Sequence, residues 1–84
     1  MRLDKFLKVS RLVKRRTVAN EACDQGLVEV NGKPVRASYA VKEGDRITLR
    51  SGLRTLTVEV AQVPENVRPG DAAALYREVE VRRT

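Results

Sequence analysis

The sequence predicts one α+β domain, with two N-terminal helices packed on a small, mostly antiparallel sheet and a short helix near the C-terminus. Three observations support this fold class. Apolar residues recur at helical spacing within the first 26 residues, and they alternate between turn signals from there to residue 60. The 84 residues are 42% hydrophobic and 33% charged, which suits a globular chain with one small core.

The first helix is indicated by two faces of different character. Its apolar side combines residues three and four positions apart, namely Leu3, Phe6 and Leu7. A different side carries basic residues three positions apart, namely Arg2, Lys5 and Lys8. Asp4 suits the first turn or the N-cap, and Ser10 interrupts the pattern. Two further apolar residues then anchor the chain, Leu12 and Val13.

The second helix is expected to begin at Thr17 as its N-cap and to end before Gly26, a residue suited to the left-handed conformation after a helix. Its predicted apolar side consists of Val18, Ala19, Ala22 and Cys23. The sequence has one cysteine and no histidine, so we interpret Cys23 as a small buried hydrophobic residue.

The strands are predicted from alternation and turn residues. Asn31-Gly32 between two short apolar runs is a strong signal for a type I′ hairpin, and Pro34 places the returning strand at an edge. A loop at 36–40 and a turn at 41–45 lead to strands at 46–50 and 53–60. The predicted core of helices and strands is Leu3, Phe6, Leu7, Leu12, Val28, Val30, Ile47, Leu49 and Val58.

The last third of the chain has weaker patterns. Asp71 is expected to cap a short helix at 72–76, and 78–81 alternates like an edge strand. Residues 82–84 are expected to fray. We therefore predict a domain at 1–60 and, at 61–84, an extension that packs on the same domain.

Positive charge is concentrated at the N-terminus. Residues 1–16 contain seven basic residues and one acidic residue, and they account for the whole net charge of +6, because ten basic and ten acidic residues cancel in 17–84. A segregated charge of this kind creates a local potential that a polyanion would feel. The partner indicated is therefore RNA, DNA or an anionic membrane surface.

Composition excludes several functions. One Phe, two Tyr and no Trp leave little for base stacking, and the absence of a long apolar run argues against a membrane and for a cytoplasmic protein. The sequence offers no histidine or cysteine set for a metal, no glycine-rich phosphate loop and no base beside Ser10. We expect a binding protein without catalytic residues, metal or cofactor.

Three motifs occur in order along residues 1–50: R-L-D-K-F-L-x-x-S-R-L-x-K-x-R-T, then Q-G-x-V-x-V-N-G-K, then V-K-x-G-D-x-I. Together they resemble the RNA-binding domain named after small-subunit ribosomal protein S-four, whose fold is also called alpha-L. A stand-alone chain of this length is similar to the RqcP family of ribosome-associated quality-control factors, which is related to the fifteen-kilodalton heat-shock protein family.

The resemblance implies a function on a large ribosomal subunit that still holds a nascent chain on tRNA. Members of that family bind 23S ribosomal RNA and peptidyl-tRNA, and they support RqcH in adding alanines to the stalled chain. The implied partners are therefore 23S ribosomal RNA, tRNA and RqcH, for a protein that we expect to be monomeric.

The candidate RNA-binding residues are Arg2, Lys5, Lys8, Arg11, Lys14, Arg15, Arg16, Thr17, Asn31 and Lys33. Arg16 and then Arg2 are the strongest candidates, because the family motif places RNA contacts at the junction of the two helices. Thr17 is interpreted mainly as a cap and Asn31 mainly as a turn residue. The remaining basic residues of the central part are interpreted as solvated: Arg36, Lys42, Arg46, Arg50 and Arg54.

Alternative functions stay open at this point. A heat-shock-type factor would recycle large subunits blocked by peptidyl-tRNA, and a general module would bind structured RNA. An adaptor would bind an acidic protein surface, and a detached piece of an RNA-modifying enzyme would need catalytic turnover from this chain.

Overall fold

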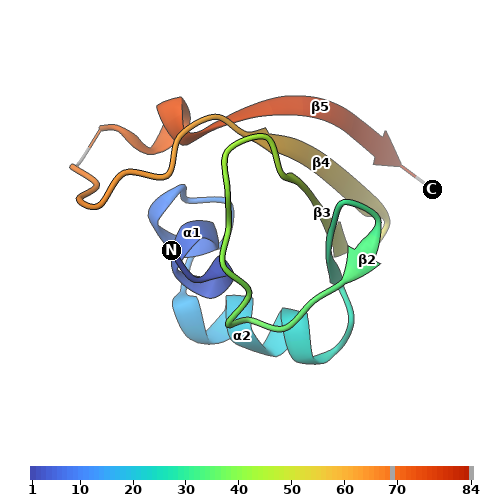
Figure 1. Ribbon diagram of the computed structural model, residues 1–84. Helices are drawn as coiled ribbons and strands as arrows, with labels where there is room; N and C mark the ends of the chain where they lie inside the picture. Colours follow the sequence, from blue (N-terminus) through green and yellow to red (C-terminus); the bar gives the residue numbers. More distant parts are fainter. Residues whose placement is uncertain (69, 84) are drawn as a thin grey trace.

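The computed structural model describes residues 1–68 and 70–83, which form two helices, a five-stranded sheet and one 3₁₀ turn (Figure 1). The elements are α1 (Leu3–Val9), α2 (Arg16–Asp24), β1 (Val28–Val30), β2 (Lys33–Pro34), β3 (Arg46–Ser51), β4 (Arg54–Val60), η1 (Ala72–Leu75) and β5 (Tyr76–Arg83). The predicted α+β class is confirmed.

The sheet is antiparallel throughout, with strand order β2-β1-β3-β4-β5. It curves around the two helices, which lie on one side of it (Figure 1). Strand β2 is an edge strand, as predicted from Pro34, because a residue without an N–H cannot donate to a second neighbour.

Strand register separates an apolar face from a polar one. Ile47 stands opposite Val30 on one side and Val58 on the other, so these side chains share the face that meets the helices. Thr48 stands opposite Thr57 on the other face, and their hydroxyl oxygens lie 3.1 Å apart. One face of the sheet therefore supplies core and the other faces solvent.

The core lies between the sheet and the helices. Its buried apolar residues are Leu3, Phe6, Leu7, Ala19, Cys23, Val28, Val30, Ala37, Val41, Ile47, Val58, Val60 and Leu75. Leu12 and Leu49, which were predicted as core, are only partly buried and pack against this cluster. Cys23 is buried as predicted, and burial raises the pKa of its thiol.

The Asn31-Gly32 hairpin has the predicted geometry. Both residues have positive φ, 53° and 86°, as a type I′ turn requires. The Asn31 side chain donates to Asp45 Oδ1 at 3.1 Å and accepts the N–H of Arg46 at 3.0 Å. Both ends of this amide therefore join the hairpin to the start of β3.

The start of the first helix agrees with its prediction, whereas the predicted N-cap of the second helix is wrong by two residues. Helix α2 begins at Arg16, with extended Arg15 in the N-cap position and no side-chain cap, so Thr17 lies inside the helix. Asp4 is in the first turn of α1, while Arg2 holds the N-cap position. Gly26 has the predicted left-handed conformation, with φ of 74°. Val18 was predicted to be on the buried side, but it is 49% exposed.

The C-terminal segment also differs from its prediction. In place of the expected helix there is a 3₁₀ turn of four residues. The Asp71 carboxylate does not cap this turn and instead accepts the N–H of Arg68 at 3.3 Å. Strand β5 extends to Arg83 because β4 offers a hydrogen-bonding partner along its length, so the predicted fraying of Arg82 and Arg83 is wrong. Thr84 lies outside the described residues.

Candidate nucleic-acid interface

Asp4 is the buried centre of the basic N-terminal surface. Its side chain is 3% exposed and lies where the first turn of α1 meets the first turn of α2. Its Oδ1 accepts the backbone N–H of Lys5 at 2.8 Å, and its Oδ2 accepts the Asn20 amide at 3.3 Å. These bonds fix the carboxylate between the two helices.

Two arginines converge on this carboxylate. Arg2 Nε donates to Oδ1 at 3.2 Å and its Nη2 to Oδ2 at 3.3 Å, while Arg16 Nη2 lies 3.3 Å from Oδ1. The Arg2 and Arg16 side chains are nevertheless 51% and 48% exposed. A guanidinium has five N–H donors, so each arginine keeps donors directed at solvent in a fixed orientation. This geometry suits a phosphate, which guanidinium groups bind bidentately.

The charge state of Asp4 follows from these contacts. Burial acts to raise its pKa, but the hydrogen bonds from Arg16, Asn20 and the Lys5 N–H, with the positive charge of Arg16, outweigh burial and lower the pKa below its ordinary value of 3.8. Asp4 is therefore ionised at neutral pH. We name Asp4, Arg2 and Arg16 the Asp4 triad. Because one negative charge pairs with two positive charges, the triad has a net positive charge.

The start of α2 adds backbone donors to this surface. No side chain caps the helix, so its first N–H groups are available to an anion, and the macrodipole favours negative charge there. Thr17 is exposed and lines a shallow hollow of about 410 Å³ with Asp4, Arg16, Asn20 and Glu21. Thr17 thus stays a candidate contact, now as a first-turn residue of the helix.

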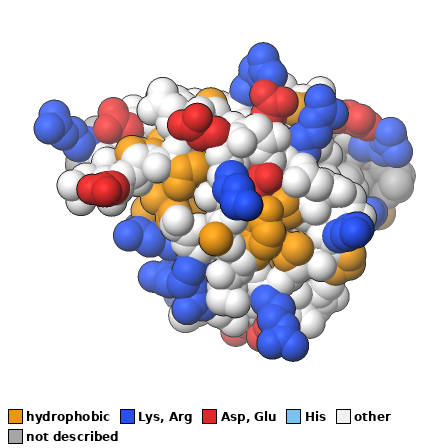
Figure 2. All heavy atoms as spheres, viewed as in Figure 1, with side chains coloured by type: hydrophobic (Ala, Val, Ile, Leu, Met, Phe, Trp, Pro, Cys, Tyr) orange, Lys and Arg blue, Asp and Glu red, His pale blue; other side chains and the backbone are white. Residues whose placement is uncertain are grey.

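The other basic residues of the N-terminus lie on α1 and in the segment between α1 and α2, and they have no ion pair within residues 1–68 and 70–83. All are exposed: Lys5, Lys8, Arg11, Lys14 and Arg15. Figure 2 shows Lys and Arg side chains gathered at the lower left, over the corner where α1 and the start of α2 lie in Figure 1. We name the set comprising Arg2, Lys5, Lys8, Arg11, Lys14, Arg15 and Arg16 the basic surface.

Asn31 and Lys33 are not brought to the basic surface. Their hairpin, with β2, lies on the far side of the molecule from α1 in Figure 1. The Asn31 amide is also occupied by Asp45 and Arg46, whereas Lys33 is exposed. The ten candidates therefore divide into a group of eight between Arg2 and Thr17, on α1, the segment after it and the start of α2, and a separate pair at the hairpin.

Sequence reasoning missed Asn20 and understated Asp4. The sequence pattern places Asp4 only in the first turn or at the N-cap, and the structure adds salt bridges from this carboxylate to Arg2 and Arg16. Asp4 of α1 is contacted from α2 by both Arg16 and Asn20. The sequence carries only a weak signal of this, namely that Arg16 and Asn20 are four residues apart and so share a face of α2.

Two further structural findings bear on function. In the part of the chain that the structure describes, no group of three or more His, Cys, Asp or Glu side chains is placed to hold a metal ion. No helix among these residues is long and apolar enough to cross a membrane.

Comparison with known proteins agrees with this geometry. The S4 domain family matches residues 1–47, which contain the whole basic surface. A Halalkalibacterium halodurans protein named RQC P-site tRNA stabilizing factor is 55% identical over 76 residues, which cover 90% of this chain and 86% of that protein. The chain belongs to the S4-domain family, among the RQC P-site tRNA stabilizing factors.

The chain is also similar to heat shock protein 15, in sequence and in structure. Heat shock protein 15 of Escherichia coli is 38% identical over 93% of this chain and 59% of its own length. The trimeric structure of Vibrio cholerae heat shock protein 15 superposes with a TM-score of 0.84 at 36% identity, covering 94% of this chain and 81% of that one. The two helices and the curved antiparallel sheet are thus the fold of this branch as well.

Proposed function

We propose that this protein stabilises peptidyl-tRNA in the P site of obstructed large ribosomal subunits during ribosome-associated quality control. The observation that carries the proposal is the pair of arginines held by Asp4 within the basic surface, whose other members have no ion pair in the described residues. Support comes from the relatives named RQC P-site tRNA stabilizing factor and from the S4 domain match. The protein acts by binding and performs no catalysis of its own.

The chemistry of the basic surface favours a folded RNA as partner. Fixed guanidinium groups and an uncapped helix start bind phosphates, and they read the shape of the RNA backbone more than its sequence. The major groove of an RNA helix is too narrow for side chains to read, so shape and phosphate contacts are the expected mode of recognition. We propose 23S ribosomal RNA and the tRNA as the two ligands.

The finer partners and the layout of the protein belong to the same proposal. The protein supports RqcH during alanine tailing, acts in the cytoplasm and works as a monomer. Residues 1–60 form the RNA-binding domain, and residues 61–84 form an extension attached to it. Pairing of β5 along β4 supports a single packed unit.

A heat-shock-type factor that recycles blocked large subunits is the second candidate. The similarity to heat shock protein 15 favours it, but the identity is lower than to the quality-control relatives, 38% against 55%. The two functions separate in cells: alanine tailing that depends on this protein supports quality control, and unchanged tailing on its deletion supports recycling.

The test is a sucrose-gradient profile of tagged protein from cells, with wild type beside Arg2→Ala and Arg16→Ala. Arg77→Ala is the matched control, because Arg77 is also an exposed, ion-paired arginine, but it lies on β5 and pairs with Glu59. We expect wild type and Arg77→Ala to sediment with large subunits that carry tRNA, and both N-terminal variants to stay at the top. If wild type also stays at the top at low salt, the proposed function is wrong.

A further inference from the structure

We propose that Lys8, Arg11 and Arg68 form a second phosphate-binding site, in which the C-terminal segment supplies an RNA contact. The inference rests on the proposed function and extends it, because Arg68 lies outside both the matched S4 domain and the basic surface. The ligand is the sugar-phosphate backbone of the same RNA that the basic surface binds.

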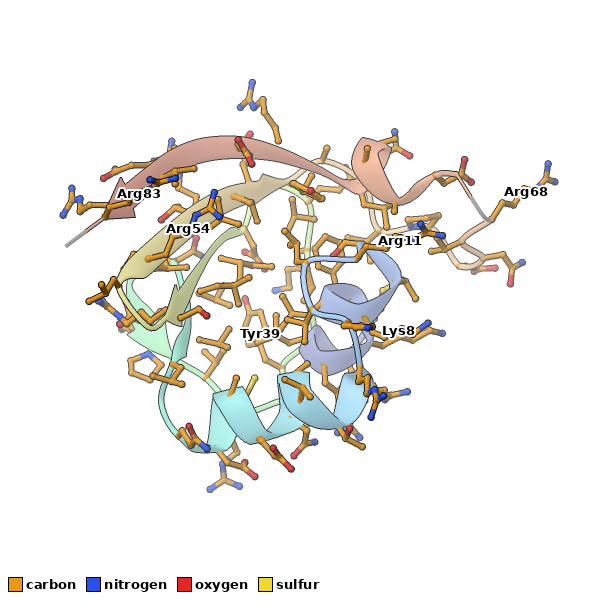
Figure 3. All side chains as sticks on the ribbon, turned by 180° about the vertical axis from the view of Figure 1, so that it is seen from behind. Lys8, Arg11, Tyr39, Arg54, Arg68 and Arg83 are labelled. Carbon is orange, nitrogen blue, oxygen red and sulfur yellow. The ribbon has the colours of Figure 1, made fainter. Side chains whose placement is uncertain are left out.

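The three cations line one hollow. The end of α1 and the segment before η1 enclose about 210 Å³, with Val9 and Val67 among the lining residues. Figure 3 shows Lys8, Arg11 and Arg68 on one side of the molecule, opposite the labelled Arg54 and Arg83. Residues about 60 positions apart in the sequence thus contribute to one concave, basic site.

No acidic side chain neutralises these cations within the described ranges, 1–68 and 70–83. None of the three has an ion pair there, whereas Arg2, Arg16, Arg46, Arg50, Arg77 and Arg82 each pair with a carboxylate. The neighbouring acid is Asp71, whose carboxylate accepts the backbone N–H of Arg68 at 3.3 Å. Three cations without an ion pair around one hollow create a positive potential that would attract a phosphate.

The backbone of Arg11 is an independent observation. Arg11 has φ of 63°, the left-handed conformation, and its N–H donates to the Lys8 carbonyl at 3.0 Å as the chain leaves α1. Glycine is the usual residue at such a position, since a side chain there is strained. Strain of this kind is often held at functional sites. From this position Arg11 lines the hollow.

Helix α1 connects this site to the Asp4 triad. Its seven residues span about 10 Å at 1.5 Å per residue, with Arg2 and Asp4 at the start and Lys8 at the end. Lys5 lies three residues before Lys8 on the same face of the helix, and so between the Asp4 triad and the second site. A single RNA backbone can therefore contact both, which makes an RNA the ligand we favour over an acidic protein.

The test compares Arg68→Gln with Arg54→Gln in binding to purified large ribosomal subunits over a range of KCl concentrations. Both changes remove one arginine that has no ion pair in the described residues, and Arg54 lies at the far end of the sheet. We expect Arg68→Gln to weaken binding and to reduce the slope of log K against log[salt] by about one unit. Arg54→Gln should keep the slope of the wild type.

Arg11→Gly provides a second variant that separates structure from binding. Glycine relieves the strained backbone, so the melting temperature should stay equal or rise, while the salt slope falls by about one unit. A residue with only a structural role would not reduce RNA binding while leaving stability intact.

The outcomes distinguish the two proposals. Wild type that fails to bind large subunits contradicts the proposed function itself. Wild type that binds, with Arg68→Gln unchanged or with Arg54→Gln equally weakened, overturns the second site alone. An Arg68→Gln defect on subunits that is absent on both protein-free 23S ribosomal RNA and tRNA would assign the contact to a ribosomal protein and also overturn it.

Discussion

Arg16 on α2 and Asp4 on α1 form an ion pair of 3.3 Å that joins the first turns of the two helices. The same carboxylate holds Arg2. One buried acid therefore serves both the packing of the helices and the orientation of the two strongest candidate RNA contacts. This coupling has consequences that a count of charges would not predict.

Asp4→Asn should weaken RNA binding although it raises the net charge from +6 to +7. The amide still fills the space, but it no longer fixes the two guanidinium groups. Removing one partner of a buried pair costs up to 3–5 kcal/mol, and about 1–2 kcal/mol is reasonable here because both arginines are half exposed. Urea denaturation measures the loss of stability, and binding to large subunits measures the loss of affinity.

Asp24→Asn is the matched control for this change. Asp24→Asn makes the same change in net charge, because it also removes one carboxylate. Asp24 is exposed at the end of α2 and has no ion pair within the described residues, so the change breaks no salt bridge there. We expect RNA binding to stay equal or strengthen slightly. Tighter binding by Asp4→Asn as well would show that total charge, and not the orientation of the arginines, determines affinity.

The Asp4 contribution to stability should depend on pH in one direction. The folded state lowers the pKa of Asp4 below its ordinary value of 3.8, so the folded state favours the ionised form. The stabilisation is fully present above the unfolded pKa and is lost as the pH falls through the lower, folded pKa. The difference in unfolding free energy between wild type and Asp4→Asn should therefore be constant near neutral pH and narrow below pH 3.8. A difference that widens in acid would contradict this account.

The elements that the sequence predicted well are those set by local chemistry. The Asn31-Gly32 turn needs positive φ at both residues, which these two residue types tolerate. The apolar side of α1 is visible because Leu3, Phe6 and Leu7 have helical spacing, and all three are fully buried. Hairpin and helix patterns of this kind depend on neighbours within a few residues.

The features that the sequence did not predict depend on how distant segments meet. Helix α2 begins at Arg16, whose side chain pairs with Asp4 on α1, and no local capping pattern reveals this contact. Strand β5 is longer than its alternation suggested because β4 lies beside it, with an irregular register at Thr57/Val58. The placement of Arg68 beside Lys8 and Arg11 likewise depends on the path of the C-terminal segment.

Asp45→Ala should destabilise the fold without affecting the basic surface directly. The Asp45 carboxylate accepts the Asn31 amide at 3.1 Å, the Tyr39 hydroxyl at 3.0 Å and the Lys42 N–H at 3.0 Å. Leaving these donors without an acceptor should cost about 2–4 kcal/mol, since each bond contributes about 1 kcal/mol and more when an acceptor is charged. Thermal denaturation tests this, and an unchanged melting temperature would contradict it.

The Tyr39 phenol reports on the same network. Its hydrogen bond to Asp45 raises its pKa above the ordinary value of 10.0, together with burial and the negative charge of Asp45. In a spectroscopic titration Tyr39 should ionise at higher pH in the wild type than in Asp45→Asn. Because the folded pKa is raised, the stabilisation is present below pH 10.0 and declines as the pH rises through the folded value. Equal titration in both proteins would show that the hydrogen bond does not form in solution.

Salt dependence should reveal how many phosphates the protein contacts. About five contacts predict that log K for RNA falls with log[salt] at a slope of about −3.5 to −4.5. Arg16→Gln should reduce this slope by about one unit, because it removes one phosphate contact. Arg46→Gln is the control, since Arg46 is also exposed and lies 3.9 Å from a carboxylate, that of Glu59 on β4, away from the helices. The measurement is fluorescence anisotropy of labelled protein with purified large subunits at increasing KCl. A slope near zero would mean that binding does not depend on phosphate contacts, and the basic surface would then need a different partner.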